Sequence, residues 1–288
     1  MNYATCKRKG NETMICFPNI KINLGLHVIN RRTDGFHNIE TVFYPVKFTD
    51  ILEVIEANAQ PEQIVFTASG LPVEGKIEDN LIVKAYNLLH TSIGLPKVKV
   101  HLHKIIPMGA GLGGGSSDAA YMITLLNQKF GLQLTVEQME SYAAQLGSDC
   151  AFFIQNTPTY AFGKGHELEP VQIDLSGYYL VLFQTGLHSS TATAYQNVRR
   201  RETFDSSNSL KEKLRVPVAQ WKGIIENDFE YTVFRALPFL AELKSALYDS
   251  GALYASMSGS GSSMYALYEK KPQLPEKLRP YVCFEGLL

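Results

Sequence analysis

Residues 107–120 of the 288-residue chain read PMGAGLGGGSSDAA, and this glycine-rich stretch is its most distinctive feature. It follows VKVHLH (98–103), whose alternation is typical of a half-buried strand, and precedes the apolar run YMITLL (121–126). Glycine has no Cβ and tolerates positive φ, so the loop's N–H groups can come close to a ligand. Ser116 or Ser117 is a suitable N-cap for the helix that follows. Since a helix N-terminus favours an anion, the order strand, loop, helix predicts a site for a phosphate chain.

Other glycine-rich loops share parts of this pattern. Residues 109–114 match G-x-G-x-x-G, the dinucleotide fingerprint, but the acidic residue expected about 20 positions later would fall in a polar, helix-like stretch. A Walker A loop would have lysine before its serine, and a protein-kinase loop would be followed by H-R-D and D-F-G. Neither is found in the sequence. The dinucleotide interpretation therefore stays open only as an alternative.

Composition restricts the class of protein. The length predicts two domains, and 45% hydrophobic with 19% charged residues is typical of a globular protein. A formal charge of -1 argues against nucleic-acid binding, and no apolar run approaches the ~20 residues that span a membrane. The four cysteines, at positions 6, 16, 150 and 283, lack metal or redox spacing. We expect reduced thiols and a cytoplasmic location.

The N-terminal third holds two candidate sites. In a strand over residues 19–28, Lys21 and Asn23 point to the same face. They could belong to an exposed edge strand, where lysine prevents pairing with another chain, or they could be part of a site. Asp34 and Gly35 then mark a turn. Phe36 and His37 follow it and could recognise a base by stacking and hydrogen bonding, or could be a core ring and a solvated imidazole.

Further polar residues lie at predicted element boundaries. Asn80 precedes an apolar helical pattern, as either a plain N-cap or a nucleotide contact, and Lys104 lies between strand and loop. Asp149 stands between a Gly-Ser step and an apolar run. It is either the cap of a buried helix or a general base that takes a proton from a hydroxyl.

The glycine loop resembles the phosphate-binding motif of the GHMP kinases. Residues 254–267, which on pattern alone are a hairpin with a Gly-Ser turn, resemble the third motif of that family. Lys21-x-Asn23 followed by Asp34-Gly35-Phe36-His37 resembles the branch whose acceptor is 4-diphosphocytidyl-2-C-methyl-D-erythritol, although that branch usually has Tyr where this chain has Phe36. The resemblance implies an α+β fold of two domains. Residues 1–162 would be ribosomal protein S5 domain 2-like, and residues 163–288 would be ferredoxin-like.

The resemblance also implies an activity. ATP, with Mg²⁺, would phosphorylate the acceptor's 2-hydroxyl in non-mevalonate isoprenoid biosynthesis; the metal ligands stay unassigned, with Ser116 and Asp118 as candidates. The partner would be this small molecule, without nucleic acid or membrane, and the protein would be a monomer or homodimer. One alternative is a GHMP kinase acting on another small alcohol, of the homoserine or mevalonate type. A second is a dinucleotide-binding oxidoreductase or nucleotide-binding module.

Site residues follow from the same resemblance. Asp149 would be the catalytic base, and Lys21 would orient it and balance charge. The residues that would contact ATP are Pro107, Met108, Gly109, Ala110, Gly111, Leu112, Gly113, Gly114, Gly115, Ser116, Ser117, Asn80 and Lys104. The residues that would bind the acceptor are Asn23, Phe36, His37, Tyr195, Gly259, Ser260 and Gly261.

Overall fold

A computed structural model describes residues 7–9, 13–57, 59–196, 198 and 209–288 and shows two compact units. The first unit comprises Met1–Ile20, Lys47–Met108 and Gly113–Thr157, and the second comprises Lys21–Val46, Gly109–Leu112 and Pro158–Leu288. The units interleave along the sequence, whereas the predicted domains are continuous, so the division at residue 162 stays a prediction. Within the described ranges, no helix combines the length and apolarity needed to cross a bilayer.

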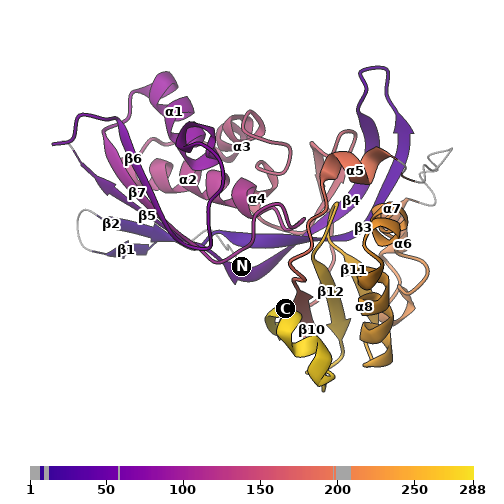
Figure 1. The fold of residues 1–288 in the computed structure, drawn as a ribbon. Helices are drawn as coiled ribbons and strands as arrows, with labels where there is room; N and C mark the ends of the chain where they lie inside the picture. The colour runs from indigo at the N-terminus through magenta and orange to yellow at the C-terminus, as the bar shows by residue number, and fades with distance from the viewer. Residues whose placement is uncertain (1–6, 10–12, 58, 197, 199–208) are drawn as a thin grey trace. The chain divides into compact units, whose positions relative to one another are not determined.

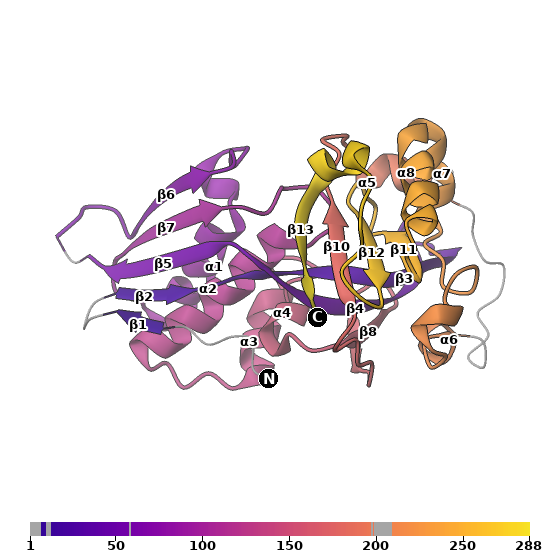
Figure 2. The ribbon, with the colours of Figure 1, turned by 90° about the horizontal axis from the view of Figure 1, so that it is seen from below.

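The first unit contains a five-stranded sheet in the order β1-β2-β5-β7-β6 (Figures 1 and 2). Its strands are β1 (Lys7–Lys9), β2 (Thr13–Cys16), β5 (Ile51–Glu56), β7 (Val98–Lys104) and β6 (Ile64–Gly70). Only the β6–β7 pairing among them is parallel. In β7, Val98, Val100 and Leu102 are buried while Lys99 is exposed. The predicted half-buried strand before the glycine loop is therefore confirmed.

Helices cover one face of this sheet (Figure 1). They are η1 (Ile77–Asp79), α1 (Leu81–Ile93), α2 (Gly114–Phe130), α3 (Val136–Ala144) and α4 (Phe152–Gln155). In α2, every residue from Ser117 to Leu126 is buried, which explains why residues 119–126 are almost all apolar, on every side of the helix.

The start of α2 differs from the prediction. Neither Ser116 nor Ser117 is the N-cap, because the helix begins one turn earlier with Gly113 as its N-cap. Gly113 has φ 72°, a left-handed conformation that favours glycine over serine. A glycine cap offers no side chain to the first-turn N–H groups, which leaves them facing the loop side of the helix.

The second unit contains two four-stranded sheets, β3-β4-β8-β9 and β11-β12-β10-β13. The first is formed by β3 (Asn19–Arg31), β4 (His37–Thr49), β8 (Thr159–Phe162) and β9 (Glu167–Pro170), and the chain passes between the units within β3 and β4. The second is formed by β11 (Tyr254–Met257), β12 (Met264–Tyr268), β10 (Tyr179–Phe183) and β13 (Val282–Leu287), paired antiparallel throughout. The predicted strand–turn–strand over residues 254–267 is thus present as β11 and β12.

Helices of the second unit supply much of its core. They are α5 (Thr191–Gln196), α6 (Leu210–Lys213), η3 (Val218–Gln220), α7 (Phe229–Ala236), α8 (Pro238–Asp249) and η4 (Glu276–Tyr281). Leu240, Leu243 and Leu247, spaced as one helical face, bury α8 in a core cluster with Val181 and Met264 of the sheet. This packing fixes the strands that lead into and out of the turn at residues 258–263.

Candidate active site

The glycine loop has a backbone that only glycine accommodates easily. Gly109, Gly111 and Gly113 all have positive φ, between 65° and 79°. A Cβ on Gly111 would lie 2.0 Å from the carbonyl oxygen of Ser258, so this position also excludes side chains by contact. The loop therefore presents bare backbone just before the N-terminus of α2, as a site for an anion requires.

Asp149 lies in the first unit, half-buried, in the turn before α4. The neighbouring thiol, Cys150, is buried, and its pKa is raised to about 11 by that burial, an effect that a hydrogen bond with Ser116 partly offsets. The helix that follows the Asp149 turn, α4, packs against α2. Cys150 is thus a buried thiol rather than a nucleophile. Cys16 and Cys283 form no disulfide with another described cysteine, and Cys6 lies outside the described residues.

Lys104 has a different surrounding from the one expected of a direct nucleotide contact. Its ammonium lies 2.6 Å from Asp50 Oδ2 and 2.6 Å from Asp118 Oδ2, with only 1% of the side chain exposed. Asp50 Oδ1 accepts hydrogen bonds from the backbone N–H groups of Ile105 and Ile106. The triad of Asp50, Lys104 and Asp118 therefore ties the end of β7 to the first turns of α2.

The charge of this triad is unbalanced. Burial is the main cause that raises the pKa of Asp118, to about 7, while the two carboxylates raise the pKa of Lys104. Among the described residues, Asp118 Oδ1 has no hydrogen-bond partner. A proton on one carboxyl would make the triad neutral overall, and the neutral triad has the lower free energy in a medium of low dielectric constant.

A small cavity of about 110 Å³ lies next to the triad in the first unit. Its lining includes Asn80, Lys104, Met108 and Gly115, four of the predicted ATP contacts, as well as Asp118. Asn80 is also the N-cap of α1, with its side-chain oxygen 2.9 Å from the Ile82 nitrogen. The capping interpretation of Asn80 is therefore confirmed, and its contact with a nucleotide stays a prediction.

Lys21 and Asn23 form a close pair in the second unit. Lys21 Nζ lies 2.6 Å from Asn23 Oδ1 and 3.4 Å from the carbonyl oxygen of Gly111. The ammonium also lies 4.7 Å from the centre of the Phe43 ring. Both side chains are at least 97% buried, so an exposed-edge role for Lys21 is excluded. A buried ammonium held by amide and carbonyl oxygens can meet a negative charge that develops beside it.

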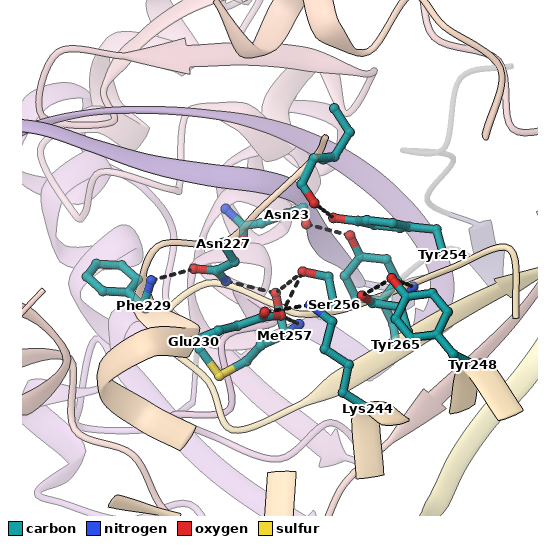
Figure 3. Close-up of polar contacts among 12 residues, drawn as sticks. Asn23, Asn227, Phe229, Glu230, Lys244, Tyr248, Tyr254, Ser256, Met257 and Tyr265 are labelled. Carbon is teal, nitrogen blue, oxygen red and sulfur yellow. Dashed lines mark hydrogen bonds and ion pairs between the residues drawn. The ribbon is translucent and has the colours of Figure 1, made fainter. Parts of the chain in front are cut away.

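The turn after β11 is fixed to this pair by polar contacts, several of which are drawn in Figure 3. Ser258 Oγ donates to the carbonyl oxygen of Gly111 at 2.8 Å. The hydroxyl of Tyr265 donates to the backbone carbonyl oxygen of Asn23 at 2.7 Å. Asn227 Nδ2 donates to the carbonyls of Met257 and Gly259, at 2.9 and 2.8 Å. The turn is thereby held against Gly111 of the glycine loop and Asn23 of β3, which both belong to the second unit.

Three predicted acceptor contacts lie in this turn, namely Gly259, Ser260 and Gly261. Ser260 Oγ lies 2.9 Å from Thr191 Oγ1, and Gly261 has φ 88°. Gly259 lies close to Asn23, since a Cβ there would be 3.4 Å from Asn23 Oδ1. The structure thus brings Gly259 beside the Lys21–Asn23 pair.

A second cavity, of about 880 Å³, is lined by two of the predicted base-binding residues. His37 and Tyr195 stack with ring centroids 4.8 Å apart, and Tyr195 meets the edge of Phe229. Arg31 and Arg235 also line this cavity. An aromatic wall with cationic neighbours is suited to a flat, anionic ligand such as a nucleotide.

Phe36 is 61% exposed, so it is not a core residue. The ammonium of Lys164 lies 4.7 Å from its ring centre and 3.0 Å from Asp34 Oδ2. The Lys164 hydrogen bond is the main cause that lowers the pKa of Asp34, to about 2. One face of the Phe36 ring is therefore covered by a cation that an ionised carboxylate holds in place.

Five polar residues of these clusters were not assigned a site role from the sequence. They are Thr41, Asp50, Asn227, Glu230 and Ser258, and each acts through a partner far away in the chain. No local pattern marks such a partner.

Comparison with known proteins places the chain in a class. Residues 80–157 match the GHMP kinases N terminal domain, and residues 211–284 match the GHMP kinases C terminal domain. The protein is a GHMP kinase, as the loop and the two-part α+β fold predicted, and the dinucleotide alternative is no longer needed.

Its relatives are more specific. The 4-diphosphocytidyl-2-C-methyl-D-erythritol kinase of Azobacteroides pseudotrichonymphae is 50% identical over 262 residues, 91% of this chain and 96% of that protein. The kinase of the same name from Bacteroides fragilis is 49% identical, over 94% of this chain and 98% of that protein. A crystal structure of 4-(cytidine 5'-diphospho)-2C-methyl-D-erythritol kinase superposes with a TM-score of 0.76 at 29% identity, covering 95% of this chain and 98% of that one. The chain belongs to the 4-diphosphocytidyl-2-C-methyl-D-erythritol kinase family.

Proposed function

We propose that this protein transfers the γ-phosphate of ATP to the 2-hydroxyl of 4-diphosphocytidyl-2-C-methyl-D-erythritol, giving the 2-phosphate and ADP in non-mevalonate isoprenoid biosynthesis. Family membership supports the reaction. The single observation that carries the choice of acceptor is the cavity at His37 and Tyr195, because it lies in the unit that also holds Lys21 and Asn23. Aromatic rings could stack on the cytosine of a cytidine-linked alcohol, and a buried ammonium could offset the negative charge that develops during its phosphorylation.

The nucleotide half of the proposal rests on the loop and α2. The N–H groups around Gly111 and Gly113 would hold the triphosphate, with the positive end of α2 adding to the attraction. Asn80 and Met108, which line the small cavity, would border the adenine ring. Lys104 would support this site through Asp50 and Asp118 rather than by placing its ammonium on the nucleotide.

The chemical step needs a base and a fixed positive charge. Asp149 would accept the proton of the 2-hydroxyl as the oxygen attacks phosphorus. The ammonium of Lys21 would orient the reacting groups and offset negative charge as it develops. Most of the remaining rate enhancement in such transfers comes from positioning, which the loop amides provide.

Magnesium fits this arrangement in a restricted way. Mg²⁺ prefers oxygen ligands and keeps several waters, and when bound it neutralises charge on the transferring phosphate. Asp118 is a poor candidate ligand, because it is only 3% exposed and its Oδ2 lies 2.6 Å from the Lys104 ammonium. We propose that the ion is held mainly by the phosphates of ATP, with the hydroxyl of Ser116 as the protein ligand.

The acceptor would be recognised by its base. Tyr195 and His37 would bind cytosine, with Phe36 contributing a stacking face and no hydroxyl. Asn23 and residues 259–261 would contact the rest of the molecule. We also infer that the enzyme works in the cytoplasm. It would be a monomer or a homodimer, and light scattering would distinguish these two states.

Transfer of label from γ-labelled ATP tests this function. Three acceptors are compared at equal concentration: 4-diphosphocytidyl-2-C-methyl-D-erythritol, homoserine and mevalonate. We expect label in the first alone, at the 2-oxygen. Label in homoserine or mevalonate would favour the alternative of a GHMP kinase for another small alcohol, and label in none would contradict the proposed reaction.

A further inference from the structure

Thr41 on β4 connects two groups of β3 through its hydroxyl. Thr41 Oγ1 donates to the carbonyl oxygen of Gly25 at 2.6 Å and accepts from Asn23 Nδ2 at 2.8 Å. Thr41 is fully buried, and Asn23 is 1% exposed. These hydrogen bonds are buried, so a group whose partner is removed by mutation cannot bond to bulk water instead.

The chain of hydrogen bonds has a direction. A hydroxyl has one proton to donate, and Thr41 donates its proton to the Gly25 carbonyl oxygen, which can only accept. Thr41 must therefore accept from Asn23, so the amide nitrogen of Asn23 faces Thr41. The amide oxygen is then turned the other way, toward Lys21 Nζ at 2.6 Å.

Asn23 is also the closest of the contacts described for the Lys21 ammonium. Its Oδ1 is 2.6 Å away, whereas the Gly111 carbonyl is 3.4 Å away and the Phe43 ring centre 4.7 Å away. A lysine side chain has four rotatable bonds, so its ammonium takes its position from such contacts. Whatever fixes the Asn23 amide therefore helps to fix the ammonium.

We propose that Thr41 is a positioning residue of the phosphoryl-transfer reaction, acting through Asn23 on the Lys21 ammonium; this rests on the proposed function. The simpler explanation is that Thr41 only fastens the backbone at Gly25, which has φ 70°. Both explanations predict some loss of stability when the hydroxyl is removed. They differ in whether that loss reaches Lys21 through Asn23.

A double-mutant cycle separates the two. Thr41→Val keeps the branched shape and removes the hydroxyl, Thr41→Ser keeps the hydroxyl, and Asn23→Ala removes the intermediate. We expect T41V to lower kcat by roughly 10–100-fold with the KM for ATP within about 2-fold, and T41S to stay within about 3-fold of the parent. In the N23A background, T41V should cost less than about 2-fold. An equal loss in both backgrounds would overturn the proposal.

A second readout does not depend on turnover. The ¹⁵N resonance of the Lys21 ammonium, assigned by its absence in Lys21→Met, is compared in the same variants without substrate. We expect it to change in T41V as it does in N23A and to be preserved in T41S. An unchanged resonance in T41V would overturn the proposal even if the parent enzyme did not phosphorylate the expected acceptor. If T41V does not fold, Thr41→Cys, whose thiol is a weak hydrogen-bonding group, takes its place.

Discussion

The hydroxyl of Ser258 lies 2.8 Å from the carbonyl oxygen of Gly111 and donates a hydrogen bond to it, although the two residues are separated by 147 positions in the sequence. The backbones of the two residues are also close together, because a Cβ on Gly111 would lie 2.0 Å from the carbonyl oxygen of Ser258. The turn after β11 and the middle of the glycine loop are thus packed backbone against backbone. Each holds the other in the shape that the proposed anion site needs.

Gly111→Ala should break this packing. Its positive φ and the 2.0 Å approach leave no room for a methyl group, so we expect a loss of unfolding free energy of about 2–4 kcal/mol together with ATP binding weaker by about tenfold or more. Gly115→Ala is the matched control for folding, since a Cβ there meets nothing within 4 Å. Urea denaturation and nucleotide titration measure both effects. A Gly111→Ala protein as stable as Gly115→Ala would contradict the packing argument.

Lys104→Met should destabilise the first unit strongly. Removing the ammonium leaves two buried carboxyl groups, Asp50 and Asp118, without their shared partner. Breaking a buried ion pair in this way costs about 3–5 kcal/mol. Lys99→Met, on the exposed face of the same strand, should change the unfolding free energy by less than about 0.5 kcal/mol. Equal unfolding midpoints for the two variants would show that the triad does not stabilise the first unit.

The triad also predicts a pH dependence of stability. Asp118 has a pKa of about 7 in the folded protein, raised by burial from an ordinary value of 3.8. Between those two pH values the folded state holds a proton that the unfolded state has lost. The folded state is therefore favoured at the acidic end, and stability falls as pH rises, with a slope of at most ~1.4 kcal/mol per pH unit.

Asp118→Asn tests this because an amide does not titrate. We expect the fall in unfolding free energy from about pH 5 to about pH 7.5 to become shallower in D118N. Asp249→Asn, an exposed site at the end of α8, should leave the fall unchanged. A D118N curve parallel to that of the parent would mean that Asp118 ionises normally.

Phe36→Ala should weaken binding of the acceptor. Stacking on an aromatic side chain contributes about 1–3 kcal/mol per base, so the KM for the diphosphocytidyl substrate should rise by roughly tenfold or more. The KM for ATP should stay within about 2-fold, and Phe36→Tyr should behave like the parent, since it keeps the ring. Steady-state kinetics with each substrate varied in turn provides the comparison. A loss confined to ATP would move the cytosine site elsewhere.

Asp149→Asn should remove the base while keeping the shape of the turn. We expect kcat to fall by about 10²–10⁴-fold, with the Kd for ATP within about 3-fold of the parent value. Ser148→Ala, in the same turn and exposed, is the control and should retain most of its turnover. Near-normal turnover in D149N would remove Asp149 from the proposed role.

Local patterns predicted the parts of this fold that local physics decides. The alternation at residues 98–103 gave β7, and the glycine run gave the loop with its positive φ angles. The N-cap was misplaced for a local reason as well, because Gly113 adopts a left-handed conformation that a serine would avoid. A helix cap was one of the two roles considered for Asn80, and the structure shows that cap.

The supports of the site could not be predicted in this way. Asp50 reaches Lys104 across 54 positions, and Ser258 reaches Asn23 across 235. Such contacts depend on how strands pair and how the turn packs, which the spacing of residues within one segment does not encode. Family resemblance indicated Lys21 and Asn23, and only the structure showed Thr41 holding them.

The central claim is that the amides of the glycine loop hold the triphosphate while Asp149 takes the proton of the acceptor's 2-hydroxyl. A crystal structure with a non-hydrolysable ATP analogue and 4-diphosphocytidyl-2-C-methyl-D-erythritol measures this directly. The account predicts β- and γ-phosphate oxygens within hydrogen-bond distance of N–H groups of residues 109–116, and an Asp149 carboxylate oxygen about 2.6–3.2 Å from the 2-oxygen. A triphosphate bound away from the loop, or a 2-hydroxyl out of reach of Asp149, would contradict it.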